Sequence, residues 1–458
     1  MPKQKTLQDK VKGIYDRIGK EFYLNRDDFE ANGERYNSVL LFGALTELNR
    51  GNMLLFGEYG GGKTTSAEYL NSVFNGLPLD LVKRVAIRGN PQLTEEKMVA
   101  RPNYGKMHQG QEDVVWQHFV LVGPKIVDEF PRIPESNQAI ILNGVDRGEW
   151  NYLNDYISND PEPFFATANY PDKGQFDLIP PIRDRFDVAV ESRFPGVANA
   201  LEIAQDYHND KDRILENPEL TRKALQILNS GKPYRDVKTE LEKIIREHEE
   251  SLISNSFPVL TKEDRERIEQ EVRAIPLDRD AEQYFAFLIS EMNTSHKYGQ
   301  KRSLDAPEAD KQQGLYLNAM FIGSGSRRQE KSLVRYAKSL AWLQNQDEVN
   351  LEHIAQVAPY VLWHRIRWTP ETEHQFKDDN RKDPSDLHIT KTLLSDGTQE
   401  APGVKKRFAE SQENYQRVID LAAHGKIDKS IEEAEDFYAG GKGHPIFKDI
   451  IKDLEVGG

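Results

Sequence analysis

A glycine-rich segment constrains this chain of 458 residues more than any other part of its sequence. It follows a short apolar run, Asn52–Phe56, and precedes a stretch that favours a helix. Glycines in such a turn let backbone N–H groups face phosphate oxygens, and the next helix presents its positive N-terminus there. A strand, this loop and a helix, in that order, predict a phosphate-binding α/β unit. The segment consists of Gly57, Glu58, Tyr59, Gly60, Gly61, Gly62, Lys63 and Thr64, and the expected contact set extends to Thr65.

Two side chains of the segment carry the expected chemistry. Lys63 can reach the terminal phosphates of a nucleotide, and Thr64 offers a hydroxyl to Mg²⁺. A second short apolar strand ends in the carboxylates Asp128 and Glu129. Asp128 would hold Mg²⁺, and Glu129 would polarise the attacking water. The alternatives are a ligand-free glycine turn and a solvated acidic pair, but Asp128 follows Lys63 by 65 residues, a usual separation for the two halves of such a site.

Three further residues are candidates with open alternatives. Asn169 follows the apolar run Phe164–Ala168, where an amide could orient the water and touch the γ-phosphate; taken alone, it favours a turn residue over this role. Arg183 and Arg185 lie in a compact acidic and aromatic setting. Either arginine could reach a neighbouring subunit's phosphate as a finger, or both could form a salt-bridged corner.

Composition excludes several classes of protein. The chain has no cysteine, which excludes disulfide scaffolds, thiolate metal sites and thiol nucleophiles and fits a reducing cytoplasm. No run approaches the roughly 18 apolar residues of a membrane helix, and the N-terminus lacks the apolar region of a secretory signal. The formal charge of −14 argues against nucleic-acid binding driven by overall charge. We therefore expect a cytoplasmic protein without a membrane partner.

Periodicity divides the chain into an α/β part and a helical part. Short apolar runs alternate with helical segments over roughly residues 40–192, which predicts a parallel sheet covered on both faces. The following residues favour helices, among them 236–253 and 328–345. Residues 369–403 are polar, contain three prolines and are predicted to be a linker. A last helix is expected at 407–423.

Taken in order, these elements resemble the AAA+ ATPases, and within them the MoxR-like branch. The resemblance covers roughly residues 35–368 and identifies Asn169 with sensor 1 and the Arg183–Asp187 region with the arginine finger. Ser324–Arg328 resembles sensor 2 at the head of a helix; Arg328 is preferred to Arg327 from its spacing to Ser326. The matched segments are Ile87–Leu93, Asp128–Pro134, Ala166–Asn169, Arg183–Asp187, Ser324–Arg328 and Val361–Arg365.

The resemblance implies an architecture and a function. It predicts an α/β P-loop core with a parallel sheet, an α-helical lid and a mainly helical C-terminal extension. It implies ATP and Mg²⁺ as cofactors, a homo-oligomeric ring with a hexamer as the expected form, and remodelling or maturation of a protein client. That client could be a protein with a von Willebrand A-type domain, served by metal or cofactor insertion. The expected segments are an N-terminal helical segment (1–34), the core (35–192), the lid (193–368), an insertion within it (208–258) and the extension (369–458).

Two other functions are weighed against this one. Related AAA+ branches are nucleic-acid motors, but the acidic charge and the lack of a helix-turn-helix or zinc module count against that role. A ring that binds nucleotide without hydrolysing it is disfavoured because both Asp128 and Glu129 are present.

Overall fold

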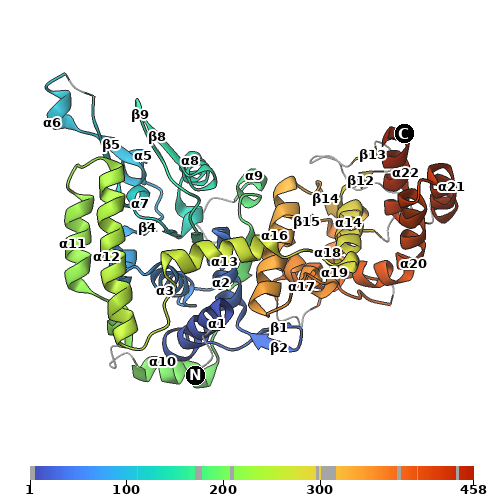
Figure 1. Cartoon of the computed structure of the whole chain (residues 1–458), viewed down its shortest axis with the longest axis horizontal. Coiled ribbons are helices and arrows are strands. Elements are labelled where there is room, and N and C mark those ends of the chain that lie inside the picture. Colours follow the sequence, from blue (N-terminus) through green and yellow to red (C-terminus); the bar gives the residue numbers. More distant parts are fainter. Residues whose placement is uncertain are drawn as a thin grey trace. The chain divides into compact units, whose positions relative to one another are not determined.

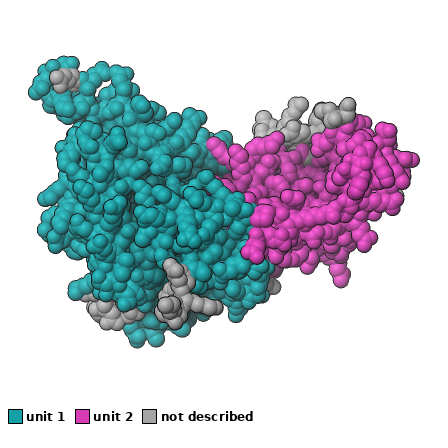
Figure 2. All heavy atoms as spheres, viewed as in Figure 1, with its two compact units in different colours: residues 1–275, 339–346 teal, residues 276–338, 347–458 magenta. Residues whose placement is uncertain are grey.

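The computed structural model describes residues 6–110, 112–170, 178–206, 211–295, 299–300, 316–378, 383–399, 401–439 and 443–457. The chain forms two compact units, shown in Figure 2. The first contains residues 1–275 and 339–346, and the second contains residues 276–338 and 347–458. Each unit is described by itself below.

The centre of the first unit is a parallel sheet of five strands in the order β11-β3-β10-β7-β4. Figure 1 labels its edge strand β4 and the helices α2 and α3. Its inner strands are buried along most of their length, because helices such as α2 and α3 pack on them. Continuous apolar runs are what such doubly covered strands require. The strands are β3 (Asn52–Phe56), β4 (Ile87–Arg88), β7 (Lys125–Asp128), β10 (Phe164–Ala168) and β11 (Val188–Glu191).

Three antiparallel hairpins accompany the sheet in this unit. In the hairpin of β8 and β9, Trp150 is buried against Phe119, whereas Tyr156 is exposed. The hairpin strands are β1 (Phe29–Ala31) with β2 (Glu34–Tyr36), β5 (Ala100–Pro102) with β6 (Val114–Trp116), and β8 (Glu149–Tyr152) with β9 (Asp155–Ser158).

Helices cover the sheet and extend the first unit. The side chain of Asn37 caps α2 by accepting from the Leu40 N–H, and almost every residue of that helix is buried. The helices are α1 (Leu7–Arg17), α2 (Ser38–Asn49), α3 (Lys63–Asn75), α4 (Leu79–Val85), α5 (Glu95–Met98), α6 (Tyr104–Met107), α7 (His118–Leu121), α8 (Glu135–Arg147), α9 (Pro180–Arg183), α10 (Val197–Asp206), α11 (Pro218–Leu228), α12 (Tyr234–Ser254) and α13 (Lys262–Ala274), with a π-helical turn at Ile18–Phe22 and 3₁₀ turns at Phe130–Arg132 and Lys211–Ile214.

The second unit is mainly helical, and α16 continues from it into the segment 339–346 of the first. Its buried ionic cluster joins Arg407 and His444 to the carboxylate of Glu291, which is completely buried. The elements are α14 (Arg279–Asn293), α15 (Leu317–Met320), α16 (Arg327–Leu343), α17 (Leu351–Leu362), α18 (Pro370–Gln375), α19 (Ser385–Leu394), α20 (Val404–Ala423), α21 (Ile427–Tyr438), α22 (Pro445–Gly457), and the short strands β12 (Thr294–Ser295), β13 (Gly299–Gln300), β14 (Phe321–Ile322) and β15 (Arg367–Trp368).

One sequence-based expectation differs from this architecture. The predicted linker at 369–403 is wrong, because α18 and α19 occupy much of it and the side chain of Leu393 is fully buried. Pro370 is the first residue of α18 and Pro384 caps α19, so these prolines begin helices. The segment boundaries expected at 34, 192 and 368 stay a prediction.

The N-terminal segment is part of the first unit. Val11, Ile14 and Ile18 are fully buried, and Lys10 forms an ion pair with Asp264 at 2.7 Å. No helix in the described ranges is both long enough and apolar enough to cross a membrane.

Candidate active site

The glycine-rich loop, the acidic pair and Asn169 meet at one edge of the central sheet, whereas Arg183 and Arg185 precede β11 and lie toward the opposite edge. Gly57 follows β3, Glu129 follows β7 and Asn169 follows β10. These three strands are parallel neighbours, so their carboxyl ends lie at the same edge. Open α/β sheets bind their ligands at this edge.

The loop after β3 has a backbone that only glycine adopts readily. Gly57, Gly60 and Gly62 have φ values of 145°, 74° and 75°. A Cβ on Gly57 would also lie 2.4 Å from the carbonyl oxygen of Ser192. The loop therefore leaves its N–H groups free of side-chain cover, which fits a phosphate group at the N-terminus of α3.

Lys63 is the first residue of α3, and its side chain returns into the loop. Its Nζ donates to the carbonyl oxygens of Gly57 at 2.9 Å and Glu58 at 2.7 Å. Burial lowers the pKa of Lys63, and the carboxylates of Asp128, Glu58 and Glu129 oppose that shift. The ammonium is thus held inside the loop, where phosphate oxygens would meet it.

Two hydroxyl groups converge on one carboxylate oxygen beside the loop. Thr64 Oγ1 donates to Asp128 Oδ1 at 2.5 Å, and Thr167 Oγ1 donates to the same oxygen at 2.6 Å. Hydroxyl and carboxylate oxygens are the donors that Mg²⁺ prefers. Thr64 and Asp128 therefore fit a Mg²⁺ site, and Thr167 orients the carboxylate.

Glu129 has an unusual backbone conformation that depends on its neighbours. Its φ of 53° is in the left-handed region, which is rare for a non-glycine residue. Its N–H donates to Thr167 Oγ1 at 2.8 Å, and its carboxylate lies 3.4 Å from Asn169 Nδ2 and 3.3 Å from Arg132 Nη2. The loop at Gly89 packs directly against this backbone: the N–H of Gly89 donates to the Asp128 carbonyl at 2.7 Å.

The two arginines proposed as fingers have contacts within their own chain. Arg185 Nη1 donates to Asn143 Oδ1 at 2.6 Å, and its Nε lies 3.8 Å from Asp146 Oδ2. Arg183 Nε donates to the Leu178 carbonyl oxygen at 2.5 Å. Both side chains are partly exposed. These contacts within one chain fit the salt-bridged corner, the alternative that the sequence left open. A role across a subunit boundary stays a prediction.

A hydrogen-bonded chain supports the loop from behind. Ser192 Oγ donates to the Gly61 carbonyl oxygen and lies 2.8 Å from the hydroxyl of Tyr23. Tyr23 is almost completely buried, and burial raises its pKa. The N-terminal segment therefore takes part in shaping the phosphate-binding loop.

Comparisons with known proteins identify the fold. The AAA lid domain model matches residues 318–385. A solved structure of a candidate ATPase from Cytophaga hutchinsonii has a TM-score of 0.54 and 19% sequence identity, over 81% of this chain and 91% of that chain. The chain has an α/β AAA+ fold. No curated protein sequence matches it.

The lid match places the sensor 2 candidates. Arg327 and Arg328 begin α16, inside the matched lid region and in the second unit. Both are exposed, and Arg327 Nη1 lies 3.8 Å from Glu330 Oε2. The match extends past residue 368, the predicted end of the lid, and includes α18. The choice between Arg327 and Arg328 stays a prediction.

Four residues that shape the AAA+ site were not predicted as site residues. Thr167 had a signal: it is the one hydroxyl residue within the apolar strand Phe164–Ala168. Gly89 lies in a segment that carried the family resemblance, but its contact with Glu129 depends on the tertiary fold. Tyr23 and Ser192 are distant in sequence from the loop they support, and no local pattern marks them.

Proposed function

We propose that this chain is a Mg²⁺-dependent ATPase. The observation that carries the proposal is the grouping of Lys63, the Thr64–Asp128 pair and Glu129 at one edge of a parallel sheet, within one compact unit. Each of these groups has a distinct task in phosphoryl transfer to water. The lid match and the structural similarity to a candidate ATPase support the same class of activity.

The chain's own residues account for the main chemical requirements. The Lys63 ammonium can exchange its two loop carbonyls for phosphate oxygens, because both contacts are ordinary hydrogen bonds. Mg²⁺, when bound, neutralises charge on the phosphate oxygens. Glu129 would accept a proton from the attacking water, and the Asn169 amide, 3.4 Å from that carboxylate, would help to orient the water.

We further propose that the protein belongs to the MoxR-like branch and acts as a cytoplasmic homo-oligomeric ring, with a hexamer as the expected form. A finger supplied by Arg185 or Arg183 of a neighbouring subunit would make hydrolysis depend on assembly. Arg328 in the lid would report the nucleotide state. The ordered set of motifs described above supports this finer assignment.

The client of the ring is proposed to be a protein, with a von Willebrand A-type domain protein as the first candidate. Exposed apolar side chains on two neighbouring loops support a protein-contacting role. Tyr104 and Tyr156 are 55% and 70% exposed, and the Asn154 side chain in the β8–β9 turn donates to Glu112 of the other loop. Nucleic acid stays the alternative client, which the charge of −14 disfavours.

The ATPase proposal is tested with two variants of the full chain. Lys63→Ala should lose tight ATP binding in calorimetry, and Glu129→Gln should bind ATP but release phosphate about 10²-fold more slowly or worse. Lys97→Ala and Glu135→Gln, which alter exposed side chains, are the matched controls. Unchanged ATP affinity in Lys63→Ala would overturn the loop assignment, and normal turnover in Glu129→Gln would overturn the role of Glu129. Phosphate release that rises only with DNA would favour the nucleic-acid motor.

A further inference from the structure

A cavity of about 580 Å³ lies at the other edge of the central sheet. It is lined by the residues that precede β7 and β10, Gly123–Pro124 and Glu162–Pro163. The ends of α2 and α3 and one side of α12 and α13 complete it. It is therefore at the amino ends of the strands, whereas the phosphate-binding loop is at the carboxyl ends. Its volume is within the usual range for small-ligand sites.

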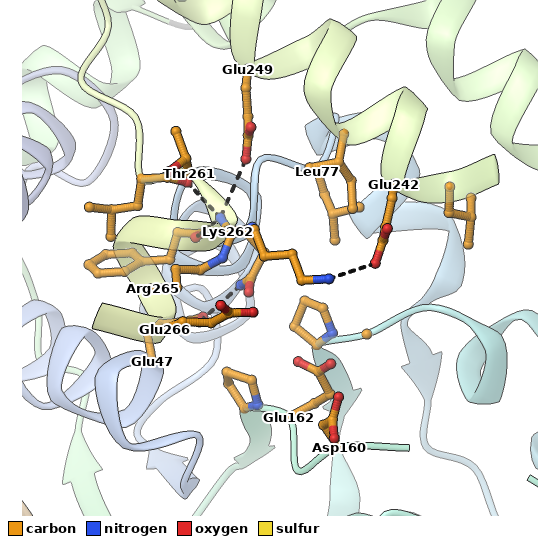
Figure 3. A pocket seen from close by; sticks show the side chains of 18 of the residues that line it. Glu47, Leu77, Asp160, Glu162, Glu242, Glu249, Thr261, Lys262, Arg265 and Glu266 are labelled. Atoms are coloured by element: carbon orange, nitrogen blue, oxygen red, sulfur yellow. Dashed lines mark hydrogen bonds and ion pairs between the residues drawn. The ribbon is translucent and has the colours of Figure 1, made fainter. Parts of the chain in front are cut away.

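The walls of this pocket combine apolar and acidic side chains. Eight Asp and Glu residues line it against five Lys and Arg residues. Figure 3 shows Glu47, Glu162 and Glu249 among the acids. Three of the basic residues are already paired with pocket carboxylates: Lys262 with Glu242 at 3.0 Å, Arg265 with Glu249 at 3.4 Å and Lys238 with Asp160 at 3.6 Å. A fourth, Arg50, pairs with Glu269 outside the pocket. The remaining carboxylates are thus in excess. Apolar contacts come from Leu77, Leu241, Ile245, Leu260 and Ile268.

Glu47 and Glu249 are the two buried acids of this pocket, and Glu249 is the one paired with Arg265. Glu47 is only 8% exposed, and one of its carboxylate oxygens, Oε2, accepts a hydrogen bond from Asn75 Nδ2 at 2.9 Å. The other oxygen, Oε1, is buried and has no hydrogen-bond donor among the described residues. Desolvation raises the pKa of Glu47 to about 8. A buried carboxyl with an unused acceptor is costly unless a donor or a cation satisfies it.

Glu162 is a second acid without an ion-pair partner in the described part of the chain. Burial raises its pKa, and the charges of Lys125, Arg50 and Lys238 oppose the shift, that of Lys125 most strongly. Arg50 and Lys238 are paired with Glu269 and Asp160. The ammonium of Lys125 has three protons, and it contacts the carbonyl oxygens of Val120, Val122 and Gly123. Lys125 is therefore occupied by backbone groups and leaves Glu162 available to another cation.

We propose that this pocket binds a primary alkylammonium group, with the ammonium at Glu47 and Glu162 and its aliphatic stem against the apolar wall of α12 and α13. The ligand is either a free aliphatic amine or a lysine side chain of a partner protein, since both present the same chemistry. Apolar walls suit an organic cation better than a metal ion. In the described ranges, no group of three or more His, Cys, Asp or Glu side chains is placed to hold a metal.

The test measures binding of 1-aminopentane to the full chain by calorimetry and by NMR, with 1-pentanol as the neutral probe of equal length. We expect the amine to bind and the alcohol to bind at least tenfold more weakly. Glu47→Gln should weaken amine binding at least tenfold. Glu247→Gln, which alters an exposed residue of α12 that is not in the pocket, is the control and should bind as the unaltered chain does.

Equal binding of amine and alcohol, or unchanged amine affinity in a folded Glu47→Gln variant, would overturn the proposal and leave Glu47 as a protonated core residue. If Glu47→Gln does not fold, as judged by circular dichroism, Glu162→Gln is held to the same tenfold criterion.

A blocked tripeptide with a central lysine forms the second arm. Tighter binding of the peptide than of the amine indicates a partner protein, and the reverse indicates a free amine; both outcomes support recognition of the ammonium.

Discussion

A methyl group on Gly89 would lie 2.2 Å from the carbonyl oxygen of Glu129. No real Cβ tolerates that distance, so an alanine at position 89 must displace the backbone that holds the proposed water-activating carboxylate. We therefore expect Gly89→Ala to reduce phosphate release by about tenfold or more while ATP affinity changes little. Gly105→Ala, whose Cβ would meet its nearest neighbour at 3.6 Å, is the matched control. Normal turnover in Gly89→Ala would show that the position of Glu129 does not limit hydrolysis.

Thr167→Val should weaken the Mg²⁺ site without changing the shape of the strand. The substitution removes the hydroxyl that donates to Asp128 and accepts from the Glu129 N–H, at a cost of about 1–3 kcal/mol for the unsatisfied groups. Titration of Mg²⁺ in the ATPase assay should show a higher requirement and a lower maximal rate. Thr167→Ser keeps the hydroxyl and should restore both. A normal Mg²⁺ requirement and rate in Thr167→Val would show that the hydroxyl has no such role.

Arg185→Ala should leave ATP binding largely intact and reduce hydrolysis by about 10³-fold, the scale of an arginine finger. Rings mixed from Arg185→Ala subunits and Lys63→Ala subunits should recover activity. In such rings the intact nucleotide site of one subunit lies beside the intact Arg185 of its neighbour. Asn143→Ala is the control, since it removes only the 2.6 Å contact of Arg185 within its own chain. An equal loss of activity in Asn143→Ala, with no recovery in rings shown to be mixed, would assign Arg185 to an internal contact.

The stability of the chain should respond to Glu47 across a defined range of pH. The pKa of Glu47 is raised from 4.5 to about 8 in the folded state, so the folded protein binds this proton more tightly than the unfolded chain does. Stability conferred by the protonated group is complete at low pH and is lost as the pH rises from about 4.5 to 8.

Glu47→Gln lacks this dependence and should gain stability relative to the unaltered chain over that range, on the order of a few kcal/mol. Denaturant unfolding at several pH values measures the difference in stability. Glu247→Gln is the control, and its difference from the unaltered chain should not change with pH. A constant difference between Glu47→Gln and the unaltered chain at all pH values would mean that Glu47 ionises normally.

The central sheet could be predicted because its strands are buried on both faces. The runs Asn52–Phe56 and Phe164–Ala168 coincide with β3 and β10, since a doubly covered strand is apolar throughout. A third short apolar run, Val85–Ile87, does not form one strand. Val85 ends α4, and β4 contains only Ile87–Arg88. Apolar residues there serve a helix and a strand in succession, which periodicity alone does not separate.

The contacts that shape the sites could not be predicted in the same way. The position of Thr167 beside Asp128 follows from the register of β10 against β7, and the burial of Glu47 follows from the packing of α2 against α3 and α13. The helices in 369–403 were missed because prolines usually interrupt helices, whereas Pro370 and Pro384 stand at helix starts.

The hydroxyl of Tyr23, behind the phosphate-binding loop, changes what counts as the smallest functional piece of this protein. A chain shortened to begin at residue 35 would keep every residue of the glycine-rich pattern, both acidic residues and the whole central sheet. It would still lose the aromatic side chain that contacts Ser192 and through it the Gly61 carbonyl. The N-terminal boundary of the proposed ATPase unit therefore has to include Tyr23, well ahead of the first recognisable motif.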